Sequence, residues 1–513
     1  MVARPEASNI SNSPWSSPLY MASSGLSVPI GTCALNIIIA VALVIGSTNE
    51  AIAEGSGFSS RRRTIEVASM MEAATASSCS STGYGNGMSM LEVVHRNGPC
   101  SKDPRPVDHS EMMTRDSLRL KWLGMKSGVR VKGWDTRESK LAKSILTVPT
   151  KLWYEIGMAA YMVTVELGTP ARKLQLDLDT GRGLTATQCK GFTKSYNQMD
   201  PVFDPSKSTT YSAATCSSPA CSRVFSMQID LSHRSGCSKS HQACTYSITY
   251  GNNTTTEGLI STDTLALALG DKITDFVFEC ALNVEGLYGS DCLLGLSNDN
   301  TSIISQTASM FGRYFSYCLL SSLNSTGFLT FGQGTTRRKP ANSTSLGFTP
   351  LIIPHVVPHL YGITITGITV GATPLSKKSS SILSKATSII DSGTVITRLP
   401  PTVYMEVCSV YKKYMAKYPK VPPAEFLDTC HDFSKFNRVR FPEKDFAFRG
   451  GMKVELDVMG IFYTFKRSQV CLAFAPNSKD SDLVVFGNMQ LRTLEVTHDV
   501  AGGKLGFSSN GCP

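Results

Sequence analysis

Two short turns, far apart in the chain, constrain the fold more than any other feature of this sequence. Asp179-Thr180-Gly181 follows the apolar run LQLDL, and Asp391-Ser392-Gly393 follows TSII. Each turn has a later counterpart in which two apolar residues precede a glycine, LLG at 293–295 and VFG at 485–487. A single triplet of this kind usually marks a surface turn. Two copies in the same order predict two similar lobes built around equivalent strands.

Aspartates on equivalent turns of two lobes are expected to meet where the lobes face each other. Carboxylates within hydrogen-bonding distance do not both ionise readily, so the pair shares one proton. The ionised member can take a proton from a water molecule while its protonated partner polarises a peptide carbonyl. We expect Thr180 and Ser392, which are small and polar, to hydrogen-bond across the interface. This chemistry hydrolyses peptide bonds and predicts no metal and no cofactor.

The rest of the chain has the pattern of strands and turns. Short runs rich in Val, Ile, Thr, Tyr and Phe recur, and YMVTVELGTP at 161–170 alternates apolar residues on one face. We therefore expect a mainly β protein. The net charge is +10, and residues 54–150 hold about half of the excess, with 15 Lys and Arg against 10 Asp and Glu. Aromatic residues do not interleave with these charges, so a nucleic-acid partner is not expected.

The first 150 residues have the pattern of targeting and processing segments. The apolar run TCALNIIIAVALVIG at 32–46, followed by Ala51 and Ala53, has the features of a signal-peptide core and cleavage site. The alternative is an uncleaved signal anchor. Further on, EMMTRDSLRLKWLGM at 111–125 predicts a basic helix. We expect its Lys and Arg side chains to lie over the acidic site and to keep the cleft shut until the carboxylates protonate.

The cysteine content agrees with the secretory pathway. Three of the 15 cysteines, Cys33, Cys79 and Cys100, precede residue 151, and the remaining 12 are an even number suited to disulfides. The competing interpretation is a zinc site, but the chain has no CxxC pair. Sequons of the form N-x-Ser/Thr also agree with secretion, and they are headed by Asn252, Asn253, Asn300, Asn324 and Asn342.

With these motifs the sequence resembles the pepsin-type aspartic proteases, and among them the plant nepenthesin-like branch, over nearly all of residues 91–512. The resemblance rests on FSYCLLSS, YGITITGITVG, IIDSGTVITRLPPTVY, LDTCHDFS and VVFGN, which occur in this order. It implies a bilobal pepsin-like fold, with two related β-rich lobes at 151–345 and 346–513 and a substrate cleft between them. It also implies a leader and signal peptide at 1–53 and a basic inhibitory propeptide at 54–150.

The resemblance further implies the roles of the site residues. Asp179 and Asp391 would form the catalytic dyad. A flap hairpin in YSITYGNNTTTEG would close over the substrate. The residues expected to contact the substrate are Tyr250 of that flap, Gly181, Gly393 and Thr394.

Several positions depart from the pattern of the family. Arg182 replaces a serine whose hydroxyl normally hydrogen-bonds the catalytic carboxylate, and Ala186 replaces a tryptophan that supports the flap tyrosine. An Arg182 that faces Asp179 would favour the ionised carboxylate and remove the shared proton. An Arg182 that turns to solvent would leave activity with a shifted pH optimum.

The cysteines depart from the pattern as well. Phe192 and Ser195 stand at positions that are usually cysteine, whereas Cys292 and Cys408 are unusual. Ten of the 12 cysteines after residue 150 therefore fit the family. Cys189 is expected to have lost its partner.

Two functional hypotheses follow. The first is a secreted aspartic-type endopeptidase, stored as a zymogen, that hydrolyses polypeptide substrates at acidic pH. It would be a monomer in the extracellular space (cell wall) or the vacuole, without a transmembrane anchor once the signal is removed. The alternative is a non-catalytic relative that binds peptides or inhibitors in the same cleft. Turnover separates the two hypotheses.

Overall fold

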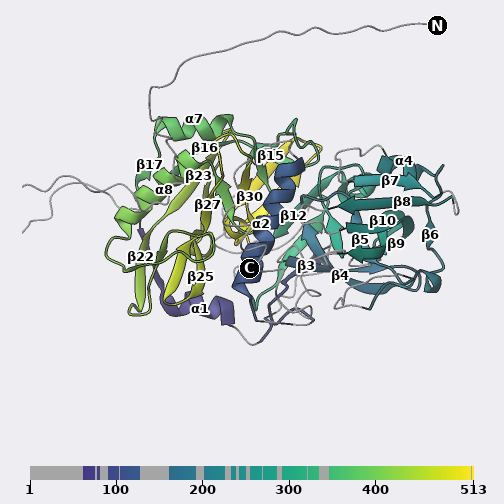
Figure 1. Cartoon of the computed structure of the whole chain (residues 1–513), viewed down its shortest axis with the longest axis horizontal. Coiled ribbons are helices and arrows are strands. Elements are labelled where there is room, and N and C mark those ends of the chain that lie inside the picture. Colours follow the sequence, from purple (N-terminus) through teal and green to yellow (C-terminus); the bar gives the residue numbers. More distant parts are fainter. Residues whose placement is uncertain are drawn as a thin grey trace, which may run out of the picture. The chain divides into compact units, whose positions relative to one another are not determined.

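Strands dominate the computed structural model (Figure 1). The structure describes residues 62–75, 78–80, 90–102, 104, 106–126, 161–191, 201–225, 233–238, 242–249, 255–267, 270–285, 292–320, 322–333, 346–509 and 511–512. The apolar run at 32–46 lies outside the described residues, as do Tyr250 and the sequons at Asn252, Asn253 and Asn342. The prediction of a mainly β protein is confirmed.

The largest sheet contains strands from both halves of the chain. Its order is β14-β30-β29-β12-β13-β2-β3-β4-β11-β5-β10-β9-β8-β7, with β6 beside β9. These strands are β2 (Met90–His95), β3 (Tyr161–Leu167), β4 (Arg172–Asp179), β5 (Thr185–Gln188), β6 (Ser212–Ala213), β7 (His233–Cys237), β8 (Cys244–Thr249), β9 (Thr255–Ala266), β10 (Lys272–Glu285), β11 (Leu293–Gly295), β12 (Tyr314–Cys318), β13 (Gly327–Phe331), β14 (Gly347–Pro350), β29 (Glu495–Asp499) and β30 (Lys504–Ser508).

The C-terminal half adds three smaller sheets. Their orders are β15-β18-β28-β19-β27, β17-β16-β23-β24 and β20-β21-β26-β25. The strands are β15 (Tyr361–Ile363), β16 (Ile365–Val370), β17 (Thr373–Pro374), β18 (Ser388–Ile390), β19 (Thr397–Leu399), β20 (Lys420–Val421), β21 (Cys430–His431), β23 (Lys444–Phe448), β24 (Lys453–Glu455), β25 (Phe462–Lys466), β26 (Gln469–Leu472), β27 (Phe474–Pro476) and β28 (Val484–Phe486).

The internal repeat of the sequence is a repeat of strand pairing. β4, which leads into Asp179, pairs in parallel with β11, so that Gly295 lies opposite Asp179. β18, which leads into Asp391, pairs in parallel with β28, so that Phe486 lies opposite Ile390. Each second strand also pairs antiparallel with the strand that follows the aspartate turn, β5 or β19. The predicted relation between the two lobes is confirmed.

Of the helices in the described residues, all but α2 and α8 are short. They are α1 (Val67–Thr75), α2 (His109–Lys126), α4 (Pro219–Phe225), α5 (Ile303–Gln306), α6 (Ala308–Phe311), α7 (Lys377–Lys385), α8 (Pro401–Tyr414), α9 (Val458–Ile461) and α10 (Asn488–Leu491), with a 3-10 turn at Pro205–Lys207. α2 is the predicted basic helix, drawn in dark blue in Figure 1. Asp108 caps its N-terminus, because the Asp108 carboxylate accepts a hydrogen bond from the Glu111 N–H at 3.0 Å.

The basic N-terminal segment pairs with strands of both halves. β1 (Arg62–Glu66) pairs antiparallel with β22 (Arg438–Pro442). β2 lies in the largest sheet between β3 and β13. β2 precedes α2 in the chain and β3 follows it, so α2 lies in the sequence between two strands that pair with each other.

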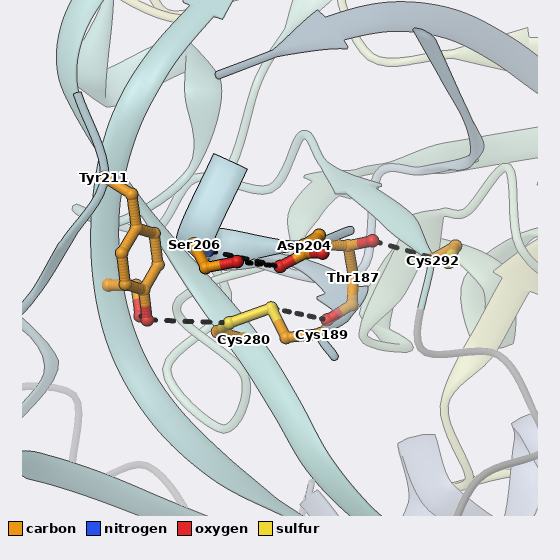
Figure 2. The surroundings of a disulfide bond; sticks show 8 residues. Thr187, Cys189, Asp204, Ser206, Tyr211, Cys280 and Cys292 are labelled. Carbon is orange, nitrogen blue, oxygen red and sulfur yellow. Dashed lines mark hydrogen bonds between the residues drawn. A yellow bond between two sulfur atoms is a disulfide. The ribbon is translucent and has the colours of Figure 1, made fainter. Parts of the chain in front are cut away.

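Five disulfides join ten of the 12 cysteines after residue 150, and a sixth joins Cys79 to Cys100. The prediction that Cys189 has lost its partner is wrong, because Cys189 is bonded to Cys280 on β10 (Figure 2). The Tyr211 hydroxyl lies 3.8 Å from Cys280 Sγ. Cys292 and Cys408 belong to none of these disulfides. The other four pairs are Cys216–Cys237, Cys221–Cys244, Cys318–Cys512 and Cys430–Cys471.

Candidate active site

The two aspartate turns meet in the interior of the protein. The Thr180 N–H donates to Ser392 Oγ at 3.0 Å, and the Ser392 N–H donates to Thr180 Oγ1 at 2.9 Å. The Ser392 hydroxyl also donates to the Leu178 carbonyl at 3.0 Å. These reciprocal bonds confirm the predicted contact between Thr180 and Ser392, and they fix the position of one turn relative to the other.

A guanidinium group from α2 lies between the two carboxylates. Arg119 donates to Asp179 Oδ1 through Nη2 at 2.7 Å and to Asp179 Oδ2 through Nη1 at 2.9 Å. The same Nη2 reaches Asp391 Oδ1 at 2.8 Å, and Nε reaches Asp391 Oδ2 at 3.1 Å. All three side chains are buried, and Arg119 is 2% exposed. Because one nitrogen bonds both aspartates, the two carboxylates lie close together around a single small site.

The buried residues of α2 recur about every three positions. Met113, Asp116, Arg119 and Trp122 lie on the buried face, followed by Leu123. Met113 packs among apolar residues of the C-terminal half, and Trp122 packs with Leu123 in a second apolar cluster there. Residues three and four apart share one side of a helix, so the sequence places these side chains in one row. Trp122 also stacks on the guanidinium of Arg119, 4.7 Å from ring centroid to Cζ.

Asp116 holds the helix at a second polar site. Its Oδ1 accepts the backbone N–H of Val395, and that of Ile396 at 3.2 Å. Its Oδ2 accepts Arg398 Nη2 at 3.0 Å. Asp116 is 1% exposed and Arg398 is 4% exposed. The helix therefore delivers one buried cation to the aspartates and one buried anion to the strand that follows them.

The pKa values of the two buried charged residues on α2 are both raised, for different reasons. Burial alone would lower the pKa of Arg119, but the carboxylates of Asp179 and Asp391 outweigh it and raise that pKa above its ordinary value. Burial raises the pKa of Asp116, against the opposing effect of Arg398 and two backbone N–H groups. Since docking raises the pKa of Asp116, protonation of this carboxyl favours the docked helix as the pH falls. Asp116 is therefore not the group that releases α2 on acidification.

The two glycines of the turns provide the space for the Arg119 guanidinium. A Cβ at Gly181 would overlap Arg119 Nη2 and would lie 2.8 Å from Asp391 Oδ1. A Cβ at Gly393 would lie 2.9 Å from Arg119 Cζ. Any other residue at these positions would close the site between the carboxylates. Gly181 and Gly393, expected to contact substrate, thus line the position that the Arg119 side chain of α2 occupies.

The two aspartates have different hydrogen-bond partners within their own turns. The Thr394 hydroxyl donates to Asp391 Oδ2 at 2.6 Å. The equivalent position after Asp179 is Arg182, and Asp179 Oδ1 instead accepts the Gly181 N–H at 2.8 Å. Apart from Arg119, Asp391 therefore has a hydroxyl donor and Asp179 has a backbone donor.

Arg182 adopts neither of the two orientations predicted from the sequence. Its side chain is buried, with 6% of its surface exposed, and Nη2 donates to Glu279 Oε2 on β10 at 3.3 Å. The expectation that Arg182 faces Asp179 is therefore wrong, and so is the expectation that it turns to solvent. A buried carboxylate draws the guanidinium away from the dyad, because a buried charge requires a partner of opposite sign. Ala186, in the place of the expected tryptophan, is buried on β5 opposite Glu279.

The flap is described only in part. β8 and β9 pair antiparallel up to Thr249 and Thr255, which gives the hairpin that the flap prediction requires. Tyr250, the expected flap tyrosine, lies outside the described residues. Three residues of the site were missed from the sequence: Asp116, Arg119 and Glu279. The Asp-x-x-Arg spacing within an apolar helical face would have identified the first two, whereas no local pattern marks Glu279.

In the described part of the chain, no group of three or more His, Cys, Asp or Glu side chains is arranged to hold a metal ion. Of the helices described, none is long and apolar enough to cross a membrane.

Family comparisons agree with the geometry. Residues 161–333 match the family model for the xylanase inhibitor N-terminal domain, and residues 360–509 match that for the C-terminal domain. An aspartyl protease family protein of Arabidopsis thaliana is 41% identical over 455 residues, which cover 88% of this chain and 93% of that protein. The aspartyl protease AED1 of the same plant is 41% identical over 456 residues, 88% of this chain and 92% of that one.

More distant relatives share the fold. The aspartic proteinase nepenthesin-1 of Nepenthes gracilis is 28% identical over 365 residues, covering 69% of this chain and 79% of that protein. Among solved structures, conglutin gamma, a basic 7S globulin from lupine seeds, aligns with a TM-score of 0.54 at 20% identity. The alignment covers 70% of this chain and 94% of that one. The predicted resemblance is confirmed, and the chain belongs to the plant pepsin-like aspartic protease family.

Proposed function

We propose that the chain is an aspartic-type endopeptidase held inactive by its own prosegment. The observation that carries this proposal is the position of Arg119, whose Nη2 lies 2.7 Å from Asp179 Oδ1 and 2.8 Å from Asp391 Oδ1. Once α2 leaves, a water molecule at the same place is within hydrogen-bonding distance of both carboxylates. One carboxylate acts as the general base for this water, and the protonated other polarises the peptide carbonyl.

Acid would open the cleft through the dyad. Arg119 is held there by attraction to two ionised carboxylates, and each proton added to the dyad removes part of that attraction. The same protonation creates the form that carries one shared proton, which the reaction requires. On this proposal a fall in pH releases the prosegment and generates the active dyad in one step.

The proposal includes the organisation of the chain and its compartment. Residues 1–53 serve as leader and signal peptide, 54–150 as propeptide, and 151–345 and 346–513 as the two catalytic lobes. Gly181, Gly393, Thr394 and the flap residue Tyr250 contact the substrate. The disulfides and the plant relatives fit a secreted or vacuolar protein. Glycosylation in the secretory pathway is part of the proposal, and Asn300 is exposed. The protein acts as a monomer.

A second candidate function rests on the first aspartate turn. Because Arg182 stands where a hydroxyl residue is expected, Asp179 has no counterpart of the bond from Thr394 to Asp391. A relative that binds peptides or inhibitors in this cleft without cutting them is the alternative. The buried pairing of Arg182 with Glu279 favours the protease, because it keeps the extra positive charge on another carboxylate.

The test is cleavage of a denatured protein by the acid-treated chain between about pH 3 and 6, beside two variants. Asp391→Asn removes one carboxylate of the dyad, whereas Asp275→Asn makes the same chemical change at an exposed site. The proposal predicts cleavage by the natural chain and by Asp275→Asn, with a loss of at least about 10³-fold in Asp391→Asn. Binding of peptides by all three forms without any cleavage would support the second candidate.

A further inference from the structure

The site that holds Asp116 has the features of a carboxylate-binding pocket. Two successive backbone N–H groups, of Val395 and Ile396, point at one oxygen, and Arg398 Nη2 binds the other at 3.0 Å. Charge-assisted bonds of this kind are about twice as strong as neutral ones. The pocket thus combines two fixed donors with one cation, a donor set that matches a side-chain carboxylate.

The pocket belongs entirely to the C-terminal half, and α2 contributes only the carboxylate. Arg398 lies on β19, which pairs with β27 and β28. Its guanidinium stacks on Phe426, 4.0 Å from Cζ to the ring centroid. Among the atoms that the structure describes, the buried Nε of Arg398 has no hydrogen-bond partner. A rigid strand and an aromatic face therefore hold the cation in place, with one donor to spare.

Removal of α2 would leave this pocket empty beside the dyad. Val395 follows Asp391 by four residues, and α2 reaches both Asp391 and the pocket from side chains only three residues apart. A polypeptide in the cleft would pass the same donors. A buried guanidinium without a carboxylate partner destabilises the protein. The pocket should therefore favour a substrate whose side chain provides a carboxylate for Arg398.

We propose that Arg398, with the N–H groups of Val395 and Ile396, forms a specificity subsite that selects an aspartate or glutamate side chain in the polypeptide substrate. Asp116 then occupies this subsite in the zymogen as a mimic of the substrate. The inference rests on the proposed endopeptidase function and deepens it by naming the chemistry of one substrate position.

The test uses the full chain after acid treatment, with internally quenched peptides in pairs. Members of a pair differ by Asp or Asn at one position, and this position is moved along the peptide. Assays at about pH 5.5 keep the carboxylate of the free peptide ionised. The comparison therefore measures whether the three donors of the pocket outweigh the burial that raises the pKa of Asp116 there. We expect one position at which the Asp peptide has a kcat/KM about 10- to 100-fold above that of its Asn partner, the range of a hydrogen bond to a charged group.

Arg398→Met should remove this preference, so that the kcat/KM values of the Asp and Asn peptides differ by less than about threefold in this variant. Arg467→Met, at an exposed arginine of the same half, is the matched control and should keep the preference. The comparison of Asp and Asn peptides in the natural protein needs no variant, so it decides the proposal even when Arg398→Met fails to fold. Hydrolysis without preference at any position would overturn the subsite.

A binding measurement separates this inference from the proposed function. Synthetic peptides of residues 109–126, with Asp116 or with Asn in its place, are titrated into acid-treated chain whose intact mass shows that α2 has been removed, by the chain itself or by an added acid protease, and binding is read by calorimetry. About tenfold or tighter binding of the Asp peptide supports the subsite even in a protein that cuts nothing. Equal binding of both peptides overturns the subsite, whether or not hydrolysis occurs.

Discussion

If the proposed function is correct, replacing Arg119 by methionine should release α2 from the aspartates without acid. Arg119 makes four hydrogen bonds of 2.7–3.1 Å to two buried carboxylates. Methionine keeps an unbranched stem of helix-forming character and removes the charge. Loss of one partner from a buried ionic network costs about 3–5 kcal/mol. Since each 1.4 kcal/mol is a factor of ten, the form with α2 released should become on the order of 10²- to 10⁴-fold more populated.

We expect the population of the released form to increase by a factor in the lower part of that range. Without Arg119, Asp179 and Asp391 can share a proton, which relieves the repulsion between two adjacent carboxylates. Met113 and Trp122 would still anchor α2 through their apolar contacts. The helix should therefore open more often and still dock between openings.

The assay is hydrolysis of an internally quenched peptide by the unprocessed chain at about pH 6, with amide hydrogen exchange over residues 109–126 measured in parallel. Arg119→Met should cleave the peptide and exchange faster than the natural chain. Lys121→Met is the matched control, because Lys121 is exposed on the same helix, and it should change neither signal. Exchange in Arg119→Met as slow as in the natural chain would refute the assigned role of Arg119, regardless of activity.

Three further predictions concern buried polar groups of the fold. Burial lowers the pKa of Lys444 to about 7, below its unfolded value, so this lysine makes stability rise with pH from about 7 to 10. Lys444→Met should flatten that slope and, at pH 5, raise the free energy of unfolding by up to about 5 kcal/mol in denaturant titrations. Arg182→Ser removes the charge partner of Glu279 and should lower the free energy of unfolding by about 3–5 kcal/mol. The double variant Arg182→Ser/Glu279→Gln should recover most of this loss. Equal stabilities of the single and double variants would contradict the pairing. Thr394→Val removes the hydroxyl bonded to Asp391 and should lower kcat about 10- to 100-fold at unchanged thermal stability, whereas an unchanged kcat would show that the bond plays no part in the reaction.

The two aspartate turns and the strands that pair beside them are predictable from the sequence, because short local motifs specify them. An apolar strand, an aspartate, a small hydroxyl residue and a glycine specify one turn, and the same pattern appears twice, at Asp179 and Asp391. The later LLG and VFG motifs identify the strands that pair with those leading into the turns. Two equivalent turns that must pack together then imply the contact between Thr180 and Ser392.

The partners of the charged groups were not predictable in the same way. Arg182 and Glu279 are 97 positions apart in the sequence. They come close in space because β5, which follows Arg182, pairs with β10, which contains Glu279. Cys189 was expected to be single because its family partners are absent, yet the same strand β10 supplies Cys280. Both contacts depend on which strands pair and in which register. The residues around a single position in the sequence specify neither.

The segment that contains α2 was predictable in part. Its helix, its basic character and its place over the acidic site follow from the sequence, but the choice of Arg119 among several basic residues does not. That choice depends on which face of α2 is buried, and Met113 and Trp122 determine the face. Asp116 was missed because an acidic residue in a basic segment was not expected to contribute to docking at an acidic site.

The most direct test of the account is the intact mass of the chain during acid treatment, followed together with peptide hydrolysis. We predict that activity appears as the chain loses α2, with a new N-terminus between residues 127 and 161. We also predict that Asp391→Asn, treated alone, keeps its full mass and stays inactive. Activity from a chain that still carries a docked α2, or loss of α2 without any activity, would contradict the claim that Arg119 covers a working pair of aspartates.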